Sequence, residues 1–276
     1  MTPTWRSTDA PAFAPLNIAD WIKVFLRGGV LCLVLLTGVF LTLCLRIIER
    51  PLHGMRRPWS GWITVAVCRI GLRLMGVARK TTGSPMRQNG VYVANHSSWL
   101  DIFTLNACAP MYFVSKAEVA TWPGIGLLAR LTGTVFVRRA RQEAAAQKAL
   151  LEARITAGHR LTIFPEGTST DGRQVLPFKP TLFAALFSEG TRHVHVQPVS
   201  VIYRAPNRRD RRFHAWWGDM AFGPHLLQIL AAPRGGCVIV TWHEPLVVSD
   251  FADRKTLARE AETCVRRAHA DGASPE

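Results

Sequence analysis

A histidine and an aspartate lie five residues apart, just after a short run of strand-forming residues. His96 and Asp101 follow "VYVA" within the segment "VYVANHSSWLDIF". In an open α/β sheet, ligands meet the carboxyl ends of the strands, so polar residues directly after apolar runs are candidates for chemistry. If the chain turns into a helix capped by Ser97 or Ser98, the carboxylate can fold back onto one imidazole nitrogen. That pairing fixes the tautomer and leaves the other nitrogen as a general base.

Three further segments carry polar residues near the ends of predicted strands. The segment "GTVFVRR" (133–139) ends in two arginines, "FPEGTSTDG" (164–172) follows the strand "LTI", and "QPVSVIY" (197–203) is an apolar strand. The proline in the last segment suits an edge strand or the wall of a groove. Glu166 and Thr168 either belong to a site at the strand end or cap the turn that follows. A single histidine near a strand end is usually an ordinary residue, so these segments decide the interpretation of His96.

The elements that would position these groups follow from the periodicity of the chain. Short runs rich in β-branched and aromatic residues recur from Val91 to Trp242, and helix-forming stretches such as 141–158 lie between them. This alternation predicts an α/β fold with a mostly parallel sheet flanked by helices. Over 251–276, Leu257, Ala261 and Val265 recur at helical spacing, which predicts a C-terminal helix and tail.

The composition indicates one sizeable domain with an apolar or anionic partner. The chain has 276 residues, of which 48% are hydrophobic and 19% charged, and its mean hydropathy is +0.10. This is more apolar than an average soluble enzyme, so part of the surplus is expected to face lipid. The formal net charge of +15 favours polyanions, either nucleic acid or an anionic membrane surface.

The segment 28–45 favours the membrane. It reads "GGVLCLVLLTGVFLTLCL", which is 18 residues without a charge. As a helix it would measure roughly 27 Å, close to the thickness of the hydrocarbon core. A secretory signal is the alternative, but the run is long for one and no cleavage-type site follows it, so we predict a retained transmembrane anchor. Basic residues are more numerous after the run than before it, which predicts that the rest of the chain is cytoplasmic. They are Lys23 and Arg27 before it, and Arg46, Arg50, Arg56 and Arg57 after it.

A second apolar stretch follows at 59–77. Arg69 and Arg73 lie one helical turn apart within it, and Trp59 and Trp62 lie near its start. Such a helix either lies in the headgroup layer of a membrane or packs into the core with one polar face. The predicted organisation is a flexible arm over 1–20, membrane-anchoring helices over 21–80, an α/β domain over 81–250, and the C-terminal helix and tail over 251–276.

The sequence contains no pattern that predicts a metal site or a nucleic-acid site. The six cysteines include no C-x-x-C pair, and no Cys, Asp or Glu accompanies His193 and His195 at metal-ligand spacing, so no metal site is predicted. The cationic cluster 208–213 is not part of an aromatic-interleaved recognition motif, so no nucleic acid is expected there. Next to a membrane helix, it is expected to contact anionic headgroups or an acidic carrier protein.

Together, the four segments resemble the signature blocks of the glycerolipid acyltransferase family, which includes lysophosphatidic acid acyltransferase. "NHSSWLD" is similar to its H-x4-D signature, and the other segments resemble the remaining blocks in the same order, over roughly residues 80–250. The resemblance implies that His96 takes a proton from an acceptor hydroxyl as its oxygen attacks the thioester of acyl-ACP or acyl-CoA. Asp101 would stabilise the imidazolium, and no cofactor is needed. The residues implied to line the acceptor site are Arg139, Glu166, Gly167 and Thr168.

One position departs from the family pattern. Members that act on glycerol phosphates commonly read FPEGTR, with the arginine holding the acceptor phosphate, and this chain has Ser169 there. An acceptor with one carboxylate needs fewer cations than a phosphate monoester does. Lyso-ornithine lipid, with a free hydroxyl and a zwitterionic head, is such an acceptor, and "FPEGTSTDG" is similar to the lyso-ornithine lipid acyltransferase branch. Alternatively, another cation replaces the arginine and lysophosphatidic acid is the acceptor. The candidates are Arg138, Arg173 and Lys179.

The resemblance also implies partners and a location. The expected partners are acyl carrier protein, the lyso-lipid acceptor, the membrane surface and an upstream amide-forming N-acyltransferase that supplies lyso-ornithine lipid. The expected location is the bacterial inner membrane, with the catalytic domain on the cytoplasmic side. A membrane-anchored basic protein that binds lipid or nucleic acid is the alternative from a different class. It predicts binding that is independent of His96 and Asp101 and sensitive to salt.

Overall fold

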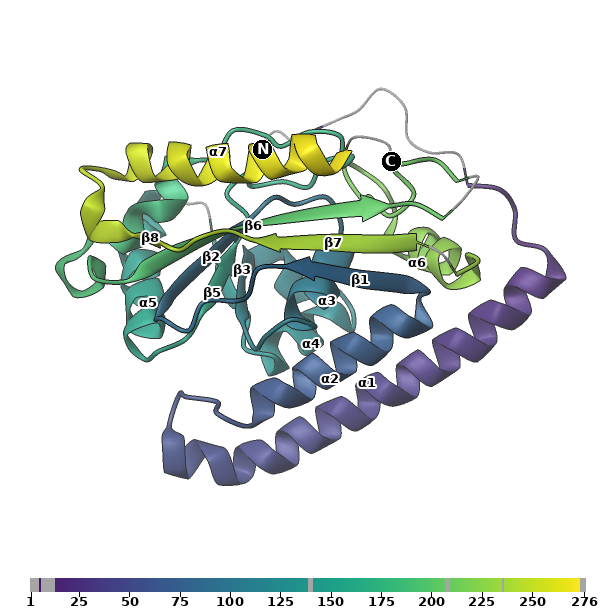
Figure 1. The fold of residues 1–276 in the computed structure, drawn as a ribbon. Coiled ribbons are helices and arrows are strands. Elements are labelled where there is room, and N and C mark those ends of the chain that lie inside the picture. Colours follow the sequence, from purple (N-terminus) through teal and green to yellow (C-terminus); the bar gives the residue numbers. More distant parts are fainter. Residues whose placement is uncertain (1–4, 6–12, 139–140, 207–208, 235, 274–276) are drawn as a thin grey trace.

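Eight strands form one sheet at the centre of the computed structural model, which describes residues 5, 13–138, 141–206, 209–234 and 236–273 (Figure 1). In spatial order the sheet is β1-β7-β6-β2-β5-β3-β4, and β8 pairs with β6. The strands β2 to β6 run in one direction and β1, β7 and β8 run in the other. The predicted mostly parallel sheet is therefore confirmed. The strands are β1 (Val77–Thr82), β2 (Gly90–Ala94), β3 (Tyr112–Lys116), β4 (Val135–Val137), β5 (Leu161–Ile163), β6 (His195–Arg204), β7 (Gly236–Trp242) and β8 (Leu246–Val247).

Helices cover both faces of the sheet. The face of the sheet that α7 covers is opposite to the face that α2 and α3 cover. In Figure 1, α7 lies above the sheet and the α1–α2 pair lies below it. The α-helices are α1 (Ile18–His53), α2 (Ser60–Leu74), α3 (Leu100–Asn106), α4 (Ile125–Leu131), α5 (Ala144–Thr156), α6 (Phe222–Ala231) and α7 (Arg254–Ala273). The short 3₁₀ helices are η1 (Ala117–Thr121), η2 (Arg141–Glu143), η3 (Pro180–Phe187), η4 (Glu189–Thr191) and η5 (Val248–Asp250).

The strand β2 lies in the middle of the sheet and is buried on both sides. Its apolar residues alternate between two hydrophobic cores, because successive side chains of a strand point to opposite faces. Tyr92 and Ala94 belong to the core shared with α1, α2, α3 and α6, and Val91 and Val93 belong to the core shared with α5, η3 and α7. A strand buried in this way holds the segment that follows it, which contains His96, in a fixed position.

The helix α1 presents an apolar surface to the outside. One side packs against α2 and α6 and buries Val24, Leu31 and Gly38. A Cβ at Gly38 would lie 2.4 Å from the Val67 side chain, so the absence of a side chain permits the close contact with α2. By length and composition α1 is apolar enough to cross a membrane, and only 17% of its most apolar stretch is buried. Its exposed large apolar residues include Phe25, Leu26, Leu33, Leu36, Phe40 and Ile47.

The helix α2 packs into the core, which is one of the two alternatives drawn from its sequence. Val65, Cys68 and Leu72 are buried against the domain, whereas Trp62 is 56% exposed. Arg69 donates a hydrogen bond from Nε to the Ala107 carbonyl oxygen at 2.8 Å, so this arginine joins α2 to the end of α3. A place in the headgroup layer of a membrane, the other alternative, stays a prediction.

Two boundaries differ from those expected. The helix α1 begins at Ile18, within the predicted arm, and Asn17 caps it through a hydrogen bond from the Asp20 backbone N–H. The sheet begins at Val77, within the predicted membrane module, because β1 pairs in parallel with β7, from Val77 opposite Gly236 onward. Polar residues in β1 obscured this edge strand, since five of its six positions are exposed.

The strand β6 is central, so the edge strand, one of the two alternatives drawn from its proline, was wrong. Pro198 lies opposite Val93 of β2, between the two antiparallel partners of β6. Pairing with β7 begins at Val199, and pairing with β8 ends at Val196. The backbone nitrogen of Pro198 therefore faces a gap in the ladder, where a missing N–H costs no sheet hydrogen bond. Its carbonyl oxygen accepts a hydrogen bond from His243 N at 3.1 Å.

Candidate active site

His96 and Asp101 meet at the carboxyl end of β2, as the sequence predicted. His96 Nδ1 lies 2.7 Å from Asp101 Oδ2. The same oxygen accepts hydrogen bonds from Ser97 N at 2.9 Å and Ser98 N at 3.1 Å, so the carboxylate is fixed by the turn it closes. Asp101 is fully buried, whereas the side chain of His96 is 21% exposed. With Nδ1 as the donor to the carboxylate, Nε2 is the basic nitrogen, and it has no hydrogen-bond partner among the described residues.

The short helix α3 supplies this geometry. Ser98 Oγ accepts a hydrogen bond from Leu100 N at 3.3 Å. The N-cap position is Trp99, which forms no side-chain cap, so the predicted serine cap was wrong. Leu100 and Leu105 are buried against the core, so the helix is anchored along its length. Asp101 stands in the first turn, where a carboxylate also interacts favourably with the helix dipole.

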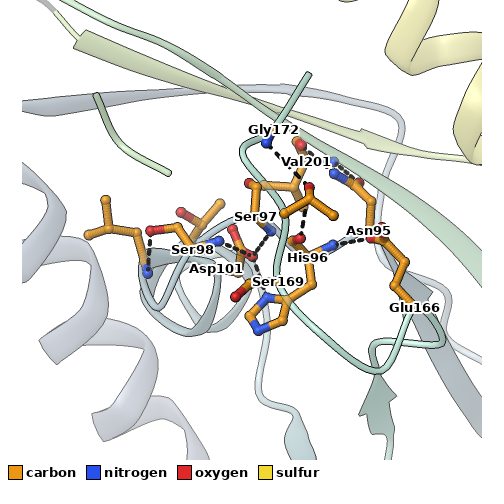
Figure 2. Close-up of polar contacts among 12 residues, drawn as sticks. Asn95, His96, Ser97, Ser98, Asp101, Glu166, Ser169, Gly172 and Val201 are labelled. Carbon is orange, nitrogen blue, oxygen red and sulfur yellow. Dashed lines mark hydrogen bonds and ion pairs between the residues drawn. The ribbon is translucent and has the colours of Figure 1, made fainter. Parts of the chain in front are cut away.

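The "FPEGT" segment holds the backbone of His96. Glu166 Oε1 accepts a hydrogen bond from His96 N at 2.6 Å (Figure 2). Oε2 accepts one from Leu176 N at 2.7 Å. The His96 carbonyl oxygen in turn accepts a hydrogen bond from Thr170 N at 3.0 Å. Glu166 is only 1% exposed, so both carboxylate oxygens serve the backbone. The resemblance implied a place for Glu166 in the acceptor site, and these contacts make it a support of His96.

Burial also changes the protonation of Glu166. It raises the pKa of this carboxyl to about 8, and the nearby Asp101 carboxylate acts in the same direction. The two backbone N–H groups that donate to Glu166, together with Arg266, lower its pKa and only partly offset the burial.

The remaining predicted site residues occupy the same loop or lie just beyond it. Gly167 has φ +73°, a conformation that favours glycine and that turns the chain back after the strand. Thr168 and Ser169 follow it, and Ser169 is 9% exposed. Lys179 is exposed, and its backbone N–H donates to the Pro165 carbonyl oxygen at 2.9 Å, which closes the loop. Arg139 lies outside the described residues.

Cationic side chains lie at the neighbouring strand ends. The parallel pairing of β3 with β4 places Lys116 opposite Val137, at the same edge of the sheet as His96. Arg138 follows directly and is 72% exposed, with Nη1 3.5 Å from Glu143 Oε1. Sequence reasoning missed Lys116. Its signal was a lysine at the end of the strand "YFVSK", by the same rule that identified His96.

Two further polar residues support the site and were also missed. The Asn95 side chain donates to the Val201 carbonyl oxygen and accepts from Val201 N, both at 2.8 Å, which fastens the end of β2 to β6 (Figure 2). Tyr203 Oη lies 3.0 Å from Thr104 Oγ1 on α3. Burial, and secondly the Asp101 carboxylate, raise the pKa of Tyr203 well above its usual value. This tyrosine therefore stays neutral behind the aspartate.

A catalytic metal finds no donor set here. Among the residues the structure describes, no three His, Cys, Asp or Glu side chains gather where they could hold an ion.

Comparison with known proteins places the chain in a family. A family described as Acyltransferase matches residues 78–202. This range contains the first three segments and all of the fourth except its last residue, Tyr203. A lyso-ornithine lipid O-acyltransferase of Rhodobacter capsulatus is 54% identical over 265 residues, which is 96% of each chain. The chain belongs to the acyltransferase family.

Other relatives of this acyltransferase are named for two different classes of acceptor. A lyso-ornithine lipid O-acyltransferase of Brucella abortus is 38% identical and covers 78% of this chain and 82% of its own. A 1-acyl-sn-glycerol-3-phosphate acyltransferase of Neisseria gonorrhoeae is also 38% identical, but over 40% of this chain and 44% of its own. The long alignments are therefore with proteins named for lyso-ornithine lipid.

A solved structure shares the fold of this acyltransferase. The crystal structure of the 1-acyl-sn-glycerophosphate acyltransferase PlsC from Thermotoga maritima matches with a TM-score of 0.57 and 20% identity. The match covers 91% of this chain and 99% of the other, so it extends beyond the sheet to the N-terminal helices. The predicted fold class is thereby confirmed.

Proposed function

We propose that this acyltransferase moves a fatty acyl group from a thioester donor to the free hydroxyl of lyso-ornithine lipid, with His96 as the general base. The observation that carries the proposal is the geometry of His96. Asp101 Oδ2 lies 2.7 Å from Nδ1, and Nε2 has no hydrogen-bond partner among the described residues. The His96 side chain is partly exposed, so Nε2 is accessible to an acceptor hydroxyl. An imidazole in this arrangement can accept a proton and is then stabilised by the carboxylate.

The proposed reaction needs no enzyme nucleophile, because a thioester is already an activated acyl group. The acceptor oxygen attacks the thioester carbonyl carbon while Nε2 of His96 takes the hydroxyl proton. The tetrahedral intermediate then collapses, the C–S bond breaks, and the leaving thiolate takes the proton from the imidazolium. An O-acyl ester and a free thiol result, and His96 returns to its neutral state. Asp101 remains ionised throughout and stabilises the transient cation.

Ser169 supports lyso-ornithine lipid as the acceptor. It is a neutral residue at the position where the phosphate-binding members have arginine, and the long alignments to proteins of this name point to the same acceptor. Lysophosphatidic acid remains the second candidate because two exposed arginines lie near the site. Arg138 and Arg173 are 72% and 64% exposed and form only loose ion pairs.

The donor and supply of this reaction are proposals as well. Acyl-ACP or acyl-CoA supplies the acyl group without a cofactor, and the basic chain would suit an acidic carrier protein. An amide-forming N-acyltransferase has to act first, because the hydroxyl that is acylated belongs to an amide-linked hydroxyacyl chain.

The exposed apolar face of α1 supports membrane association, and we propose the cytoplasmic side of the bacterial inner membrane as its place. One side of α1 packs along the domain from Val24 to Glu49, so the domain accompanies both ends of the helix. A helix crossing the membrane would carry that packed side into lipid. We therefore propose that α1 lies in the cytoplasmic leaflet, with its outer face in contact with the acyl chains.

Acyl transfer by membranes that contain the protein tests this function. Lyso-ornithine lipid and lysophosphatidic acid are offered in parallel with acyl-ACP or acyl-CoA, and products are measured by mass spectrometry. We expect lyso-ornithine lipid to react preferentially and His96→Ala to abolish transfer while still accumulating in the membrane. Normal transfer by His96→Ala would overturn the mechanism, and a preference for lysophosphatidic acid would overturn the acceptor assignment.

A pair of variants at one position refines the acceptor test. Ser169→Arg is expected to raise kcat/KM for lysophosphatidic acid relative to lyso-ornithine lipid by about tenfold, the effect of one added charge-assisted contact. Ser169→Gln has a long neutral side chain and serves as the matched control, with no such change expected.

A further inference from the structure

An aromatic ring lies flat against the imidazole of the proposed base. The ring centroids of His96 and Phe164 are 4.1 Å apart, with 16° between the ring planes. Phe113 continues the row, since its centroid lies 5.9 Å from that of Phe164, also at 16°. His96 lies just after β2, Phe164 follows β5 directly, and Phe113 lies in β3. These strands are neighbours in the sheet, in the order β2-β5-β3, so the order of the strands produces the stack.

Phe164 is held by the same loop that holds His96. Its carbonyl oxygen accepts a hydrogen bond from Gly167 N at 3.0 Å, which closes the turn just before the loop continues. Glu166, two residues after Phe164, accepts from His96 N at 2.6 Å. The relative position of the two rings is therefore set by backbone contacts on both sides and does not depend on the ring contact alone.

The hydrogen bond from His96 Nδ1 to Asp101 leaves one rotation of the imidazole unrestricted. An Nδ1 donor with a single acceptor still permits the ring to rock about the N–H···O axis, which would move Nε2. A flat aromatic neighbour restricts that motion. Its negative π-face also attracts a cation, so it favours the imidazolium that forms when Nε2 accepts a proton.

We propose that Phe164 is a positioning residue for the acyl transfer, orienting the His96 imidazole and stabilising its protonated form. This rests on the proposed function, because it assumes that His96 is the base. Phe164 touches neither the acceptor hydroxyl nor the thioester in this role, and it acts only through the histidine.

Among the described residues, charged and titratable groups face this ring pair from α3, the loop after β5, β6 and α7. Asp101 of α3 faces Nδ1, and Glu166 of the loop after β5 faces the backbone N–H. Tyr203 of β6 lies beyond Asp101, and Arg266 of α7 acts on Glu166 from the other side. A substitution at Phe164 leaves these groups in place, so a change in pH dependence can be ascribed to the ring.

Substitutions that separate shape from π-electrons test the proposal. Phe164→Leu removes the ring, whereas pentafluorophenylalanine at position 164 keeps the shape and reverses the sign of its face. Phe113→Leu removes the outer ring and is the matched control. For each protein, kcat and KM are measured with acyl donor and lyso-ornithine lipid from pH 5 to 9, with membrane accumulation as the check on folding.

We expect Phe164→Leu and the fluorinated ring to lower kcat by about 5- to 30-fold, with KM changed less than twofold. The acid limb of the kcat/KM profile should move to lower pH in both, because the protonated base is less favoured. Phe113→Leu should stay within threefold of the parent. An unchanged acid limb in the fluorinated protein would overturn the proposal, even if Phe164→Leu fails to accumulate.

The two levels of failure are distinguishable. If His96→Ala retains normal transfer, the proposed base is wrong and the ring has nothing to position. If His96→Ala is inactive while the fluorinated protein keeps the parent kcat and pH profile, the base stands and the role of Phe164 is refuted.

Discussion

At the scale of residues, one oxygen atom of Asp101, Oδ2, fixes the position of the His96 imidazole. It accepts from two backbone N–H groups and from His96 Nδ1. In Asp101→Asn, an amide NH₂ can face Nδ1 and force the proton onto Nε2, which removes the basic nitrogen. We expect kcat to fall about 10²- to 10⁴-fold at an unchanged level of protein in the membrane, measured by acyl transfer to lyso-ornithine lipid.

A change on the same turn serves as the control for this variant. Ser98→Ala removes the 3.3 Å hydrogen bond from Leu100 N to Ser98 Oγ and leaves the carboxylate in place. Its kcat should stay within threefold of the parent. Activity of Asp101→Asn close to that of Ser98→Ala would mean that the aspartate does not control the tautomer.

The sequence was sufficient to predict the pair His96 and Asp101, because their spacing spans one turn at the end of an apolar strand. It was insufficient for Glu166. The sequence "FPEGT" does not indicate whether its glutamate faces a ligand or accepts hydrogen bonds from two backbone N–H groups. The contacts of Glu166 with His96 N and Leu176 N become visible only when the loop is seen to fold back to His96. Asn95 and Phe164 were missed for a similar reason, since their partners lie on other strands.

At the scale of elements, one buried carboxylate joins the two N-terminal helices. Glu49 near the end of α1 accepts hydrogen bonds from Trp59 N and Ser60 N at 2.8 and 3.2 Å, which caps the start of α2. Ser60 Oγ and Arg46 also donate to it. Glu49→Ala would leave these donors without their acceptor, at a cost of about 2–4 kcal/mol in the free energy of unfolding.

Thermal unfolding in detergent measures that cost. Arg50→Ala, an exposed change on the following residue, is the control and should alter the melting temperature little. Glu49→Ala should still transfer acyl groups at low temperature, because no contact of the His96 and Asp101 pair is changed. Equal melting temperatures for the two variants would show that the cap contributes nothing to stability.

The elements were predictable where the apolar pattern was strong, and less so where pairing decides. The buried strands β2, β3 and β5 stood out as β-branched runs between helices. The edge strand β1 did not, because its exposed "ARKTT" residues carry no apolar alternation. For β6 the edge alternative was wrong, since a proline is excluded from a central strand only where its nitrogen faces a partner.

At the scale of the whole molecule, buried histidines should make stability depend on pH. Burial is the main cause that lowers the pKa of His159, His214 and His225 to about 4 each. In the unfolded chain they titrate near 6.5, so acidification below that value favours unfolding, by roughly 1–2 kcal/mol per histidine at pH 5. Glu166 acts in the opposite sense, because its raised pKa favours the folded state as pH falls from 8.

On acidification the three histidines destabilise the folded state by more than Glu166 stabilises it. The melting temperature should therefore fall between pH 7 and pH 5. His214→Gln removes one of the titrating groups from a site where Nδ1 has no hydrogen-bond partner among the described residues. Its melting temperature should therefore decline less steeply over the same interval. A parallel decline in the parent and the variant would show that His214 does not contribute to the acid sensitivity.

The arrangement of α1 relative to the membrane can be tested at its two ends. The 36-residue helix measures roughly 54 Å, well beyond the ~30 Å hydrocarbon core, and the domain packs along one side of it. If α1 lies in the cytoplasmic leaflet, cysteines at Ala19→Cys and Arg56→Cys, both exposed positions, should react with an impermeant maleimide from the cytoplasmic side only. The parent chain is the control for labelling of its own cysteines. Cys32 and Cys44 are exposed on α1 in the structure, and contact with lipid should protect them from the maleimide. Labelling of the two engineered positions from opposite sides would instead establish a transmembrane helix, and the packing of α1 against α2 and α6 would then have to differ in the membrane.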